Sequence, residues 1–535
     1  MRLVATKVNN MDNNEIKYTL PEGWIWTTIG EIGIVASGGT PPTRNPEFWG
    51  GDIAWITPSD LSNYKNVYIS KGARNITRIG LEYSSAKLFP KGSILFSSRA
   101  PIGYVVIAKN EMSTNQGFKN IIITESLISE YVYYYLKTIK PLAEKMASGT
   151  TFLELSATKF TQIPFPLAPL KEQSRIVAKI EELFSELEHA EAGLIKAQKI
   201  LRVYRHALLK NAFEGKLTEK WRNENPLKIN KSGENFNIQL PNGWIWNNLG
   251  NIAQISMGQS PPGNTYNTKG NGLPLINGPV EFNKSPFSKT KKVKWTTKPL
   301  KICDEGDLLI CVRGSTTGRQ NIAGFTACIG RGVAAIHASD KISIDYLAYF
   351  TYFSQRKIYE MGTGSTFPSI SKEQIGNILV PLCPISEQIQ IVEELEKRFT
   401  LIENLDKSII NAFLKIELNR QSILKKAFKG DLIAQDKNDE PAINLLNKIF
   451  QKKDLYILDQ KLITKEKPIK KKSMDTNYTI KEILEKTVQP IESRELWLKS
   501  KHKDNIEEFY AELKKIEHEI NIIIEGKESS IILKR

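Results

Sequence analysis

The chain has 535 residues, a formal net charge of +16 and a sequence pI near 9.3. This length predicts three or four domains, and the 41% apolar fraction is typical of a folded protein. The positive charge favours a polyanionic partner, nucleic acid first, although a lysine-rich proteome would give the same balance. No apolar run is long enough for a membrane span, so a membrane protein is not expected.

The N-terminal residues predict a cytoplasmic protein. Residues 1–16 are expected to form an N-terminal arm, and they lack the apolar core of a signal peptide. The four cysteines contain no CxxC pair and the five histidines lie far apart in sequence. We therefore expect reduced, buried thiols and no zinc site or other metal site.

An internal repeat begins near residue 20. LPEGWIWTTIGEIGIVASGGTPP (20–42) recurs as LPNGWIWNNLGNIAQISMGQSPP (240–262). PLAPLKEQSRIVAKIEELF (166–184) recurs as PLCPISEQIQIVEELEKRF (381–399), and LLKNAFEGKL (208–217) as ILKKAFKGDL (423–432). The segments between, 43–160 and 263–370, differ greatly. A duplication with divergent middles predicts two modules that read different targets, although neutral drift would also produce divergence.

The repeat predicts two mixed α/β globular domains at 17–170 and 237–385, each followed by a long helix at 171–214 and 386–429. Apolar residues recur at spacings of three and four along both helices, which predicts a coiled-coil seam. Each helix of about 33 seam residues would span roughly 50 Å. Chain order then makes the pair antiparallel, with a pseudo-two-fold relation between the repeats. The predicted seam consists of Ile176, Ile180, Leu183, Leu187, Leu194, Leu201, Leu208, Ile391, Leu395, Ile402, Leu405, Ile409, Ile416 and Ile423.

The remaining segments are a linker at 215–236, a tail at 430–450, a lysine-rich linker at 451–475 and a small helical module at 476–535. Gly215 and Gly430 are placed as helix C-termini. The C-terminal module either contacts a partner subunit or adds a stabilising helix pair.

In this order and duplicated, these motifs resemble the specificity subunits of type I restriction–modification systems, over residues 17–450. The resemblance implies an α+β fold with two target-recognition domains separated by the helix pair. It implies that each domain reads half of a bipartite, asymmetric double-stranded DNA target. It further implies two methyltransferase subunits docked on the helices and added restriction/translocase subunits. A coiled-coil scaffold and a tandem-headed DNA-binding regulator are the alternatives.

The chain itself is not expected to be an enzyme. Asn45-Pro46-Glu47-Phe48 lacks the second proline of a methyltransferase catalytic loop, and the loop after Gly258 lacks the lysine of a phosphate-binding loop. No cofactor is predicted on this chain. AdoMet, ATP and Mg would belong to the partner subunits.

Polar and basic residues near the predicted loops are the candidates for DNA contacts, because phosphates bind basic groups and bases need paired donors and acceptors. Arg99 and Arg313 occupy equivalent positions, so they are predicted to bind the DNA backbone or hold the fold rather than tell sequences apart. Residues 283–303, with seven lysines and no acid, form a predicted phosphate-binding surface. The full set is Thr40, Arg44, Ser98, Arg99, Asn115, Gln116, Asn264, Arg313, Arg319, Arg331, Ser365 and Thr366.

Overall fold

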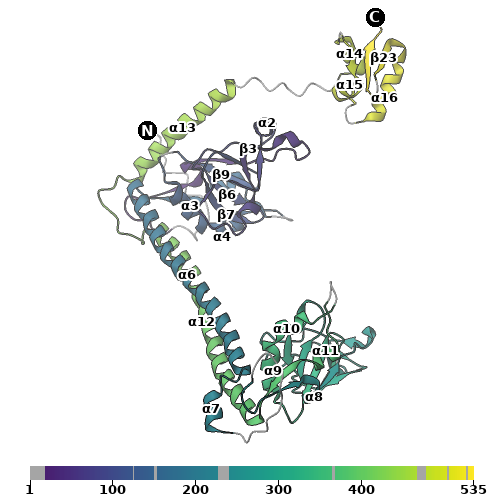
Figure 1. The fold of residues 1–535 in the computed structure, drawn as a ribbon. Coiled ribbons are helices and arrows are strands. Elements are labelled where there is room, and N and C mark those ends of the chain that lie inside the picture. Colours follow the sequence, from purple (N-terminus) through teal and green to yellow (C-terminus); the bar gives the residue numbers. More distant parts are fainter. Residues whose placement is uncertain are drawn as a thin grey trace. The chain divides into compact units, whose positions relative to one another are not determined.

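The computed structural model describes residues 18–124, 126–149, 153–226, 240–363, 368–466, 478–487, 489–502, 505–525 and 528–534. The chain divides into two compact units, 1–179 with 424–535 and 180–423 (Figure 1). The first unit contains the first head (residues 18–168) and the second unit contains the second head (residues 240–384). Residues 1–17, which include the predicted arm (1–16), lie outside the described part.

The first head is a mixed α/β domain. Its larger sheet has the order β2-β9-β6-β7-β4, from Ile34–Ser37, Phe118–Ile122, Ile94–Ser98, Ile102–Ala108 and Tyr68–Ile69. A smaller sheet, β5-β3-β8, comprises Arg74–Ile76, Trp49–Ile56 and Met112–Thr114. Helix α3 (Ser129–Thr138) buries its tyrosines in the core, and α4 (Lys140–Met146) follows it. The short helices α1 (Ile29–Ile32), α2 (Arg78–Glu82) and α5 (Ala157–Thr161) complete this domain.

The second head repeats this plan. Its sheet β12-β20-β17-β18 comprises Ala253–Met257, Val333–Ala338, Leu308–Cys311 and Gln320–Ile322. The other sheet, β13-β15-β14-β19-β16, comprises Tyr266–Asn267, Lys294–Thr296, Leu273–Ile276, Ala327–Ile329 and Ile302–Cys303. Its helices are α8 (Leu249–Ile252), α9 (Ile344–Phe353), α10 (Gln355–Glu360) and α11 (Lys372–Gly376). The two mixed α/β domains inferred from the repeat are thus confirmed.

The duplicated tryptophans join the first strand of each head to the long helix that leaves it. Strand β1 (Ile25–Thr28) pairs antiparallel with β10 (Pro164–Leu167), as β11 (Ile245–Asn248) does with β21 (Leu379–Leu382). The Trp24 indole donates a 2.9 Å hydrogen bond to Glu172, and the Trp244 indole donates one of the same length to Glu387. Both carboxylates are buried, so the repeated GWxW and EQ motifs are parts of one structural element.

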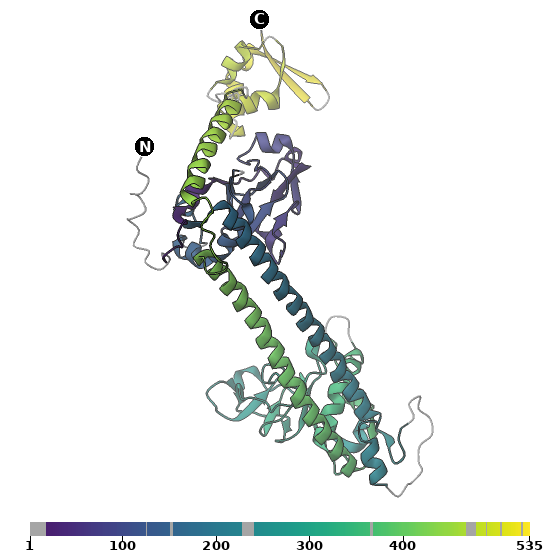
Figure 2. The ribbon, with the colours of Figure 1, turned by 90° about the vertical axis from the view of Figure 1, so that its left-hand side faces the viewer.

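The two long helices are α6 (Leu170–Phe213) and α12 (Ile385–Lys429). Within the second unit they lie side by side and run antiparallel (Figure 2). Two interhelical ion pairs fix the register: Arg205–Asp406 at 2.8 Å and Arg420–Glu191 at 2.7 Å. The repeat relates Glu191 to Asp406 and Arg205 to Arg420, so the two pairs are the same contact seen twice.

The predicted seam residues are buried or half-buried with one exception. Leu405 is wrong, because its side chain is 51% exposed while its neighbour Asp406 faces α6. Counting from Ile402, a step of three leads to Leu405 and a step of four leads to Asp406, and both steps fit a heptad. The apolar residue was the prediction, but the acidic residue occupies the seam. A polar pair at a seam position specifies register at some cost in stability, which accounts for Asp406 there.

Breaking one of these interhelical ion pairs is expected to weaken the helix pair. Arg205→Glu should destabilise the protein by about 1–2 kcal/mol, because it replaces a half-buried ion pair with two like charges. Adding Asp406→Arg should recover most of the loss. Lys196→Glu, an exposed change of equal charge on the same helix, is the control for thermal melting. An equal loss in the control would contradict a register-setting pair.

Each head also contains the end of the long helix that starts at the other head. Phe428 of α12 contacts the Tyr131 and Tyr135 rings in the first head, and Phe213 of α6 contacts the Tyr346 ring in the second. The next glycine, Gly430 or Gly215, has positive φ, and an added Cβ would lie 2.1 or 2.3 Å from Pro21 or Pro241. Both glycines end their helices as predicted.

The segments after the helices differ from the sequence predictions. Helix α7 (Glu219–Glu224) lies within the predicted linker 215–236. Helix α13 (Ala442–Glu466) occupies much of the predicted lysine-rich linker 451–475. Its first turns bury Leu445, Leu446 and Ile449. Within the predicted linker, the Lys453 ammonium donates to the Gly30 carbonyl of the first head.

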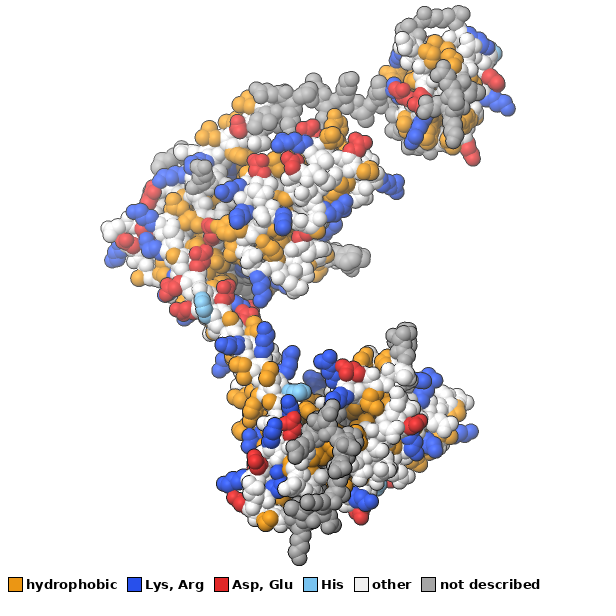
Figure 3. Space-filling view, viewed as in Figure 1, with side chains coloured by type: hydrophobic (Ala, Val, Ile, Leu, Met, Phe, Trp, Pro, Cys, Tyr) orange, Lys and Arg blue, Asp and Glu red, His pale blue; other side chains and the backbone are white. Residues whose placement is uncertain are grey.

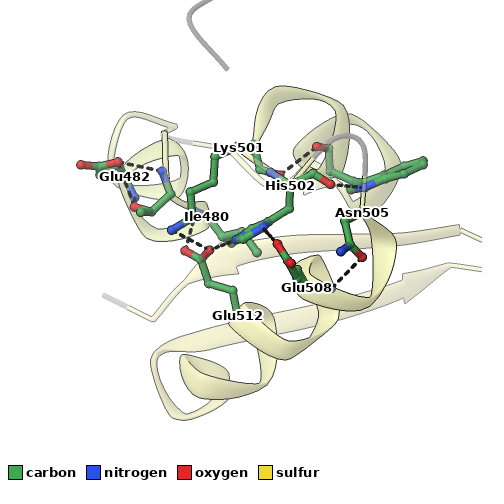
Figure 4. Close-up of polar contacts among 10 residues, drawn as sticks. Ile480, Glu482, Lys501, His502, Asn505, Glu508 and Glu512 are labelled. Carbon is green, nitrogen blue, oxygen red and sulfur yellow. Dashed lines mark hydrogen bonds and ion pairs between the residues drawn. The ribbon is translucent and has the colours of Figure 1, made fainter. Parts of the chain in front are cut away.

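The C-terminal module is α/β rather than purely helical. It comprises α14 (Ile480–Glu485), α15 (Ser493–Lys499), α16 (Ile506–Lys515) and a sheet in the order β22-β24-β23 (Ile491–Glu492, Glu528–Leu533, Ile520–Glu525). The runs of isoleucine in the last two strands favour strand structure, which the predicted helical module did not include. Figure 4 shows Glu512 contacting His502, Lys501 and the Ile480 amide, contacts that lower the carboxyl pKa although burial opposes the shift.

The four cysteines are buried and free, as predicted. Among the described residues, no helix combines the length and the apolar character that a membrane crossing requires.

Candidate nucleic-acid interface

A rigid glycine loop positions two candidates in the first head. The Gly39 amide donates to the Thr114 carbonyl at 2.8 Å, and a Cβ on Gly39 would lie 2.2 Å from the Ser85 carbonyl oxygen. The Trp55 indole donates to the Gly39 carbonyl at 3.0 Å. This packing fixes the backbone on either side of Thr40, and Arg44 follows as an exposed side chain.

A second loop of the first head lies against Thr40. The Thr40 hydroxyl donates to the Gln116 side-chain oxygen, and Gln116 is exposed. Asn115 turns this loop, because its side-chain oxygen accepts the Gly117 amide at 2.9 Å. Three of the predicted residues are therefore brought together, with Gln116 the most accessible.

Arg99 and its neighbours form a charged group beside that loop. Arg99 lies 3.7 Å from Glu154, and the buried Lys119 ammonium lies 3.2 Å from the same carboxylate. Ser98 was wrongly predicted as a DNA contact: it is fully buried, accepting from Lys119 and donating to the Gly117 carbonyl. It is the last residue of β6, and all five residues of that strand are buried.

The second head has the matching pair of loops. The Gly258 amide donates to the Val333 carbonyl at 2.9 Å, as the loop begins. The Ser260 hydroxyl accepts the backbone amide of Arg331 at 3.2 Å, and the Arg331 side chain is exposed. Ser260 was not among the predicted residues, although it stands where the repeat has Thr40.

The other candidates of the second head are more scattered. Asn264 is exposed in a short 3-10 turn, and Arg313 is exposed and forms a backbone bridge with Ser369. Arg319 is half-buried, and its guanidinium reaches the Asn283 carbonyl at 3.5 Å. Ser365 and Thr366 lie outside the described residues.

The lysine-rich segment is a basic surface. All seven lysines of residues 283–303 are exposed, and one of them, Lys289, forms an ion pair, with Glu305 at 2.9 Å. The second head, residues 240–384, contains fifteen lysines and arginines against eight aspartates and glutamates. Figure 3 shows blue basic side chains around this head. The charge suits a polyanion.

Among the described residues, one group has the spacing to hold a metal ion: Asp304, Asp307 and His337. The Asp307 carboxylate already accepts the Asp304 amide at 2.9 Å and contacts the His337 ring at 2.8 Å. Both of its oxygens are thus engaged in contacts that hold the turn before β17.

Comparisons with known proteins agree with this geometry. The family model of the type I restriction modification DNA specificity domain matches residues 21–197 and 241–412. The MjaIX specificity subunit of Methanocaldococcus jannaschii is 32% identical over 437 residues, 78% of this chain and 95% of that protein. The EcoKI specificity subunit of Escherichia coli is 24% identical over 450 residues, covering 79% and 92%.

Two solved structures are also similar. A chain described in work on complex assembly and conformational transition of the type I R-M system has a TM-score of 0.63 at 27% identity, over 78% of this chain and 100% of its own. The crystal structure of the HsdS subunit from Thermoanaerobacter tengcongensis has a TM-score of 0.51 at 26% identity, over 79% and 100%.

Proposed function

Because the chain belongs to the type I restriction–modification specificity subunits, and both of its heads are DNA specificity domains, we propose that it reads a bipartite, asymmetric target with one half-site per head. The observation that carries this proposal is the pairing of a shared backbone frame with different exposed side chains. Thr40 and Gln116 stand where Ser260 and Arg331 stand in the other head. Two heads that share a backbone frame but carry different side chains on it suit half-sites of different sequence.

The chain acts, in this proposal, as a non-catalytic subunit within the cytoplasm. The relatives that it matches are specificity subunits. Methyl transfer to adenine requires a flipped base and AdoMet, and DNA translocation requires ATP and Mg. These cofactors are assigned to the methyltransferase and restriction/translocase subunits.

The helix pair offers two equivalent apolar surfaces for partner subunits. Ile195 and Val203 on α6 are equivalent in the repeat to Ile410 and Leu418 on α12, and all four are 41% to 69% exposed. Apolar side chains in solvent at matched positions indicate protein contact sites. Two equal surfaces favour two copies of one partner, which we assign as the methyltransferase subunit.

The C-terminal module is assigned a protein partner rather than DNA. Residues 478–535 contain eleven lysines and arginines against twelve aspartates and glutamates, in contrast to the basic second head. Exposed Ile506 and Tyr510 lie one turn apart on α16, beside Glu507. A nearly neutral surface with exposed apolar side chains offers phosphates little attraction and suits a restriction or methyltransferase subunit.

Long-read methylation mapping of the genome, with and without this gene, tests the function. Loss of methylation at one split, asymmetric motif is expected on deletion, and a plasmid copy should restore it. Identical methylation in both strains, with the partner methyltransferase expressed, would contradict the proposal. A regulator of transcription would change transcript levels instead.

A further inference from the structure

The two heads place one pair of residues in the same backbone frame. In the first head the Ser98 amide donates to the Gly117 carbonyl at 2.8 Å, and in the second the Val312 amide donates to the Gly332 carbonyl at 2.9 Å. The next residues, Arg99 and Arg313, each form a bridge to equivalent positions, Glu154 and Ser369. Gln116 and Arg331, one residue before each glycine, are therefore structurally equivalent.

The neighbouring loop supports both residues in similar ways. Thr40 and Ser260 follow the equivalent glycines Gly38 and Gly258 by two positions. The Thr40 hydroxyl donates to the Gln116 side chain, while the Ser260 hydroxyl accepts the Arg331 backbone amide. In each head, a hydroxyl on one loop thus holds the equivalent residue of the other loop, Gln116 or Arg331.

Both side chains keep the groups that recognise a base. Thr40 uses one acceptor site of the Gln116 oxygen, which leaves its amide donors and a second lone pair. Among the described residues, no hydrogen bond or ion pair engages the Arg331 guanidinium. Each side chain is exposed on a tightly packed backbone. A Cβ on the preceding Gly330 would lie 1.9 Å from Asn277 Oδ1.

Contact with phosphate alone does not account for the difference between the two residues. Phosphates are the same in every sequence, so residues that bind only the DNA backbone have no reason to differ between heads. Arg99 and Arg313, by contrast, are the same residue type at equivalent positions of the two heads. This is what residues that bind only the DNA backbone are expected to show. Glutamine pairs in two contacts with adenine N6 and N7, and arginine with guanine O6 and N7.

We infer that Gln116 and Arg331 are equivalent base-reading residues, Gln116 for an adenine in one half-site and Arg331 for a guanine in the other. This inference rests on the proposed function and adds a base and a residue to it. Thr40 and Ser260 are positioning residues. The two-contact geometry implies discrimination of roughly 5- to 150-fold at each base, the equivalent of 1–3 kcal/mol.

The test uses the full chain with its methyltransferase subunits, in cells and on synthetic duplexes. Gln116→Ala should lower discrimination at one adenine of one half-site by that factor and leave the other half-site unchanged. Arg331→Ala should do the same at one guanine of the other half-site. Thr40→Val should weaken the Gln116 effect without abolishing it. Lys109→Ala, an exposed lysine of the first head, is the matched control.

The outcomes separate this inference from the function on which it rests. Unchanged sequence preference in both variants, with melting temperatures like the wild type, would overturn the base-reading roles. So would a uniform loss of affinity for all duplexes, which would make both residues backbone contacts. If the wild-type complex methylates no split motif, the proposed function itself fails.

Discussion

Replacing residues 43–160 with the equivalent segment of another type I specificity subunit is expected to change one half of the methylated sequence completely and leave the other half unchanged. The graft carries the Arg44, Arg99 and Gln116 loops but keeps Trp24 and the Glu172 carboxylate that it contacts. The head's attachment to α6 is therefore preserved. Methylation mapping of the hybrid complex measures the result.

The reciprocal graft of residues 263–370 is the matched control for the first. It should change only the other half of the sequence, because it carries Arg313 and Arg331 and keeps Trp244 with Glu387. A change in both halves with either graft, or in neither, would show that the heads do not read independently.

Glu387→Gln is expected to cost about 3 kcal/mol of unfolding free energy, as breaking a buried ion pair does. Glu387 is fully buried, and Arg222, whose side chain is 15% exposed, lies 2.9 Å from it. The Thr218 hydroxyl donates to the same carboxylate oxygen at 2.8 Å. The substitution leaves the guanidinium buried without its counter-charge. Urea unfolding at neutral pH measures the loss.

The equivalent substitution in the first head, Glu172→Gln, is expected to be neutral or stabilising, which makes it a matched control. In the first head the cation near Glu172 is Arg175, and it pairs with Asp439 instead. Burial raises the pKa of Glu172 above its ordinary value of 4.5, so its ionised form costs stability. The wild type should therefore lose stability relative to the variant as pH rises from about 4.5 toward the folded pKa of Glu172. Equal losses in the two heads would contradict this assignment.

The repeat and the apolar periodicity predicted the heads and the long helices. Both patterns report burial directly: Ile176, Ile391 and Leu395 lie in the core because apolar surface leaves water. The spacing did not decide between Leu405 and Asp406, because an ion pair from another helix reversed the preference for the apolar residue. The pairing partner, Arg205, lies 201 positions from Asp406 and cannot be recognised from the local sequence.

The sequence predicted which residues belong to the candidate site but not which of them contact one another. The sequence predicts both Thr40 and Gln116 as DNA contacts, yet only the fold shows that their side chains touch. The apolar run before Ser98 predicts that this residue lies at an accessible strand end, but it is still inside buried β6, where Lys119 from another strand donates to its hydroxyl. Ser260 had a visible signal, since it aligns with Thr40 in the repeat, and that alignment predicts its role.

The core of the first head has a consequence for synthesis. The rings of Tyr131 and Tyr135 contact Phe428, and Tyr18 donates to the Phe428 carbonyl across 410 positions of sequence. A ribosome finishes the first head's own residues long before it makes the phenylalanine that covers these rings. Until then their apolar surface is open to chaperones and proteases. A chain that stops after the second head keeps that surface uncovered, so truncated products are expected to be degraded rather than to assemble.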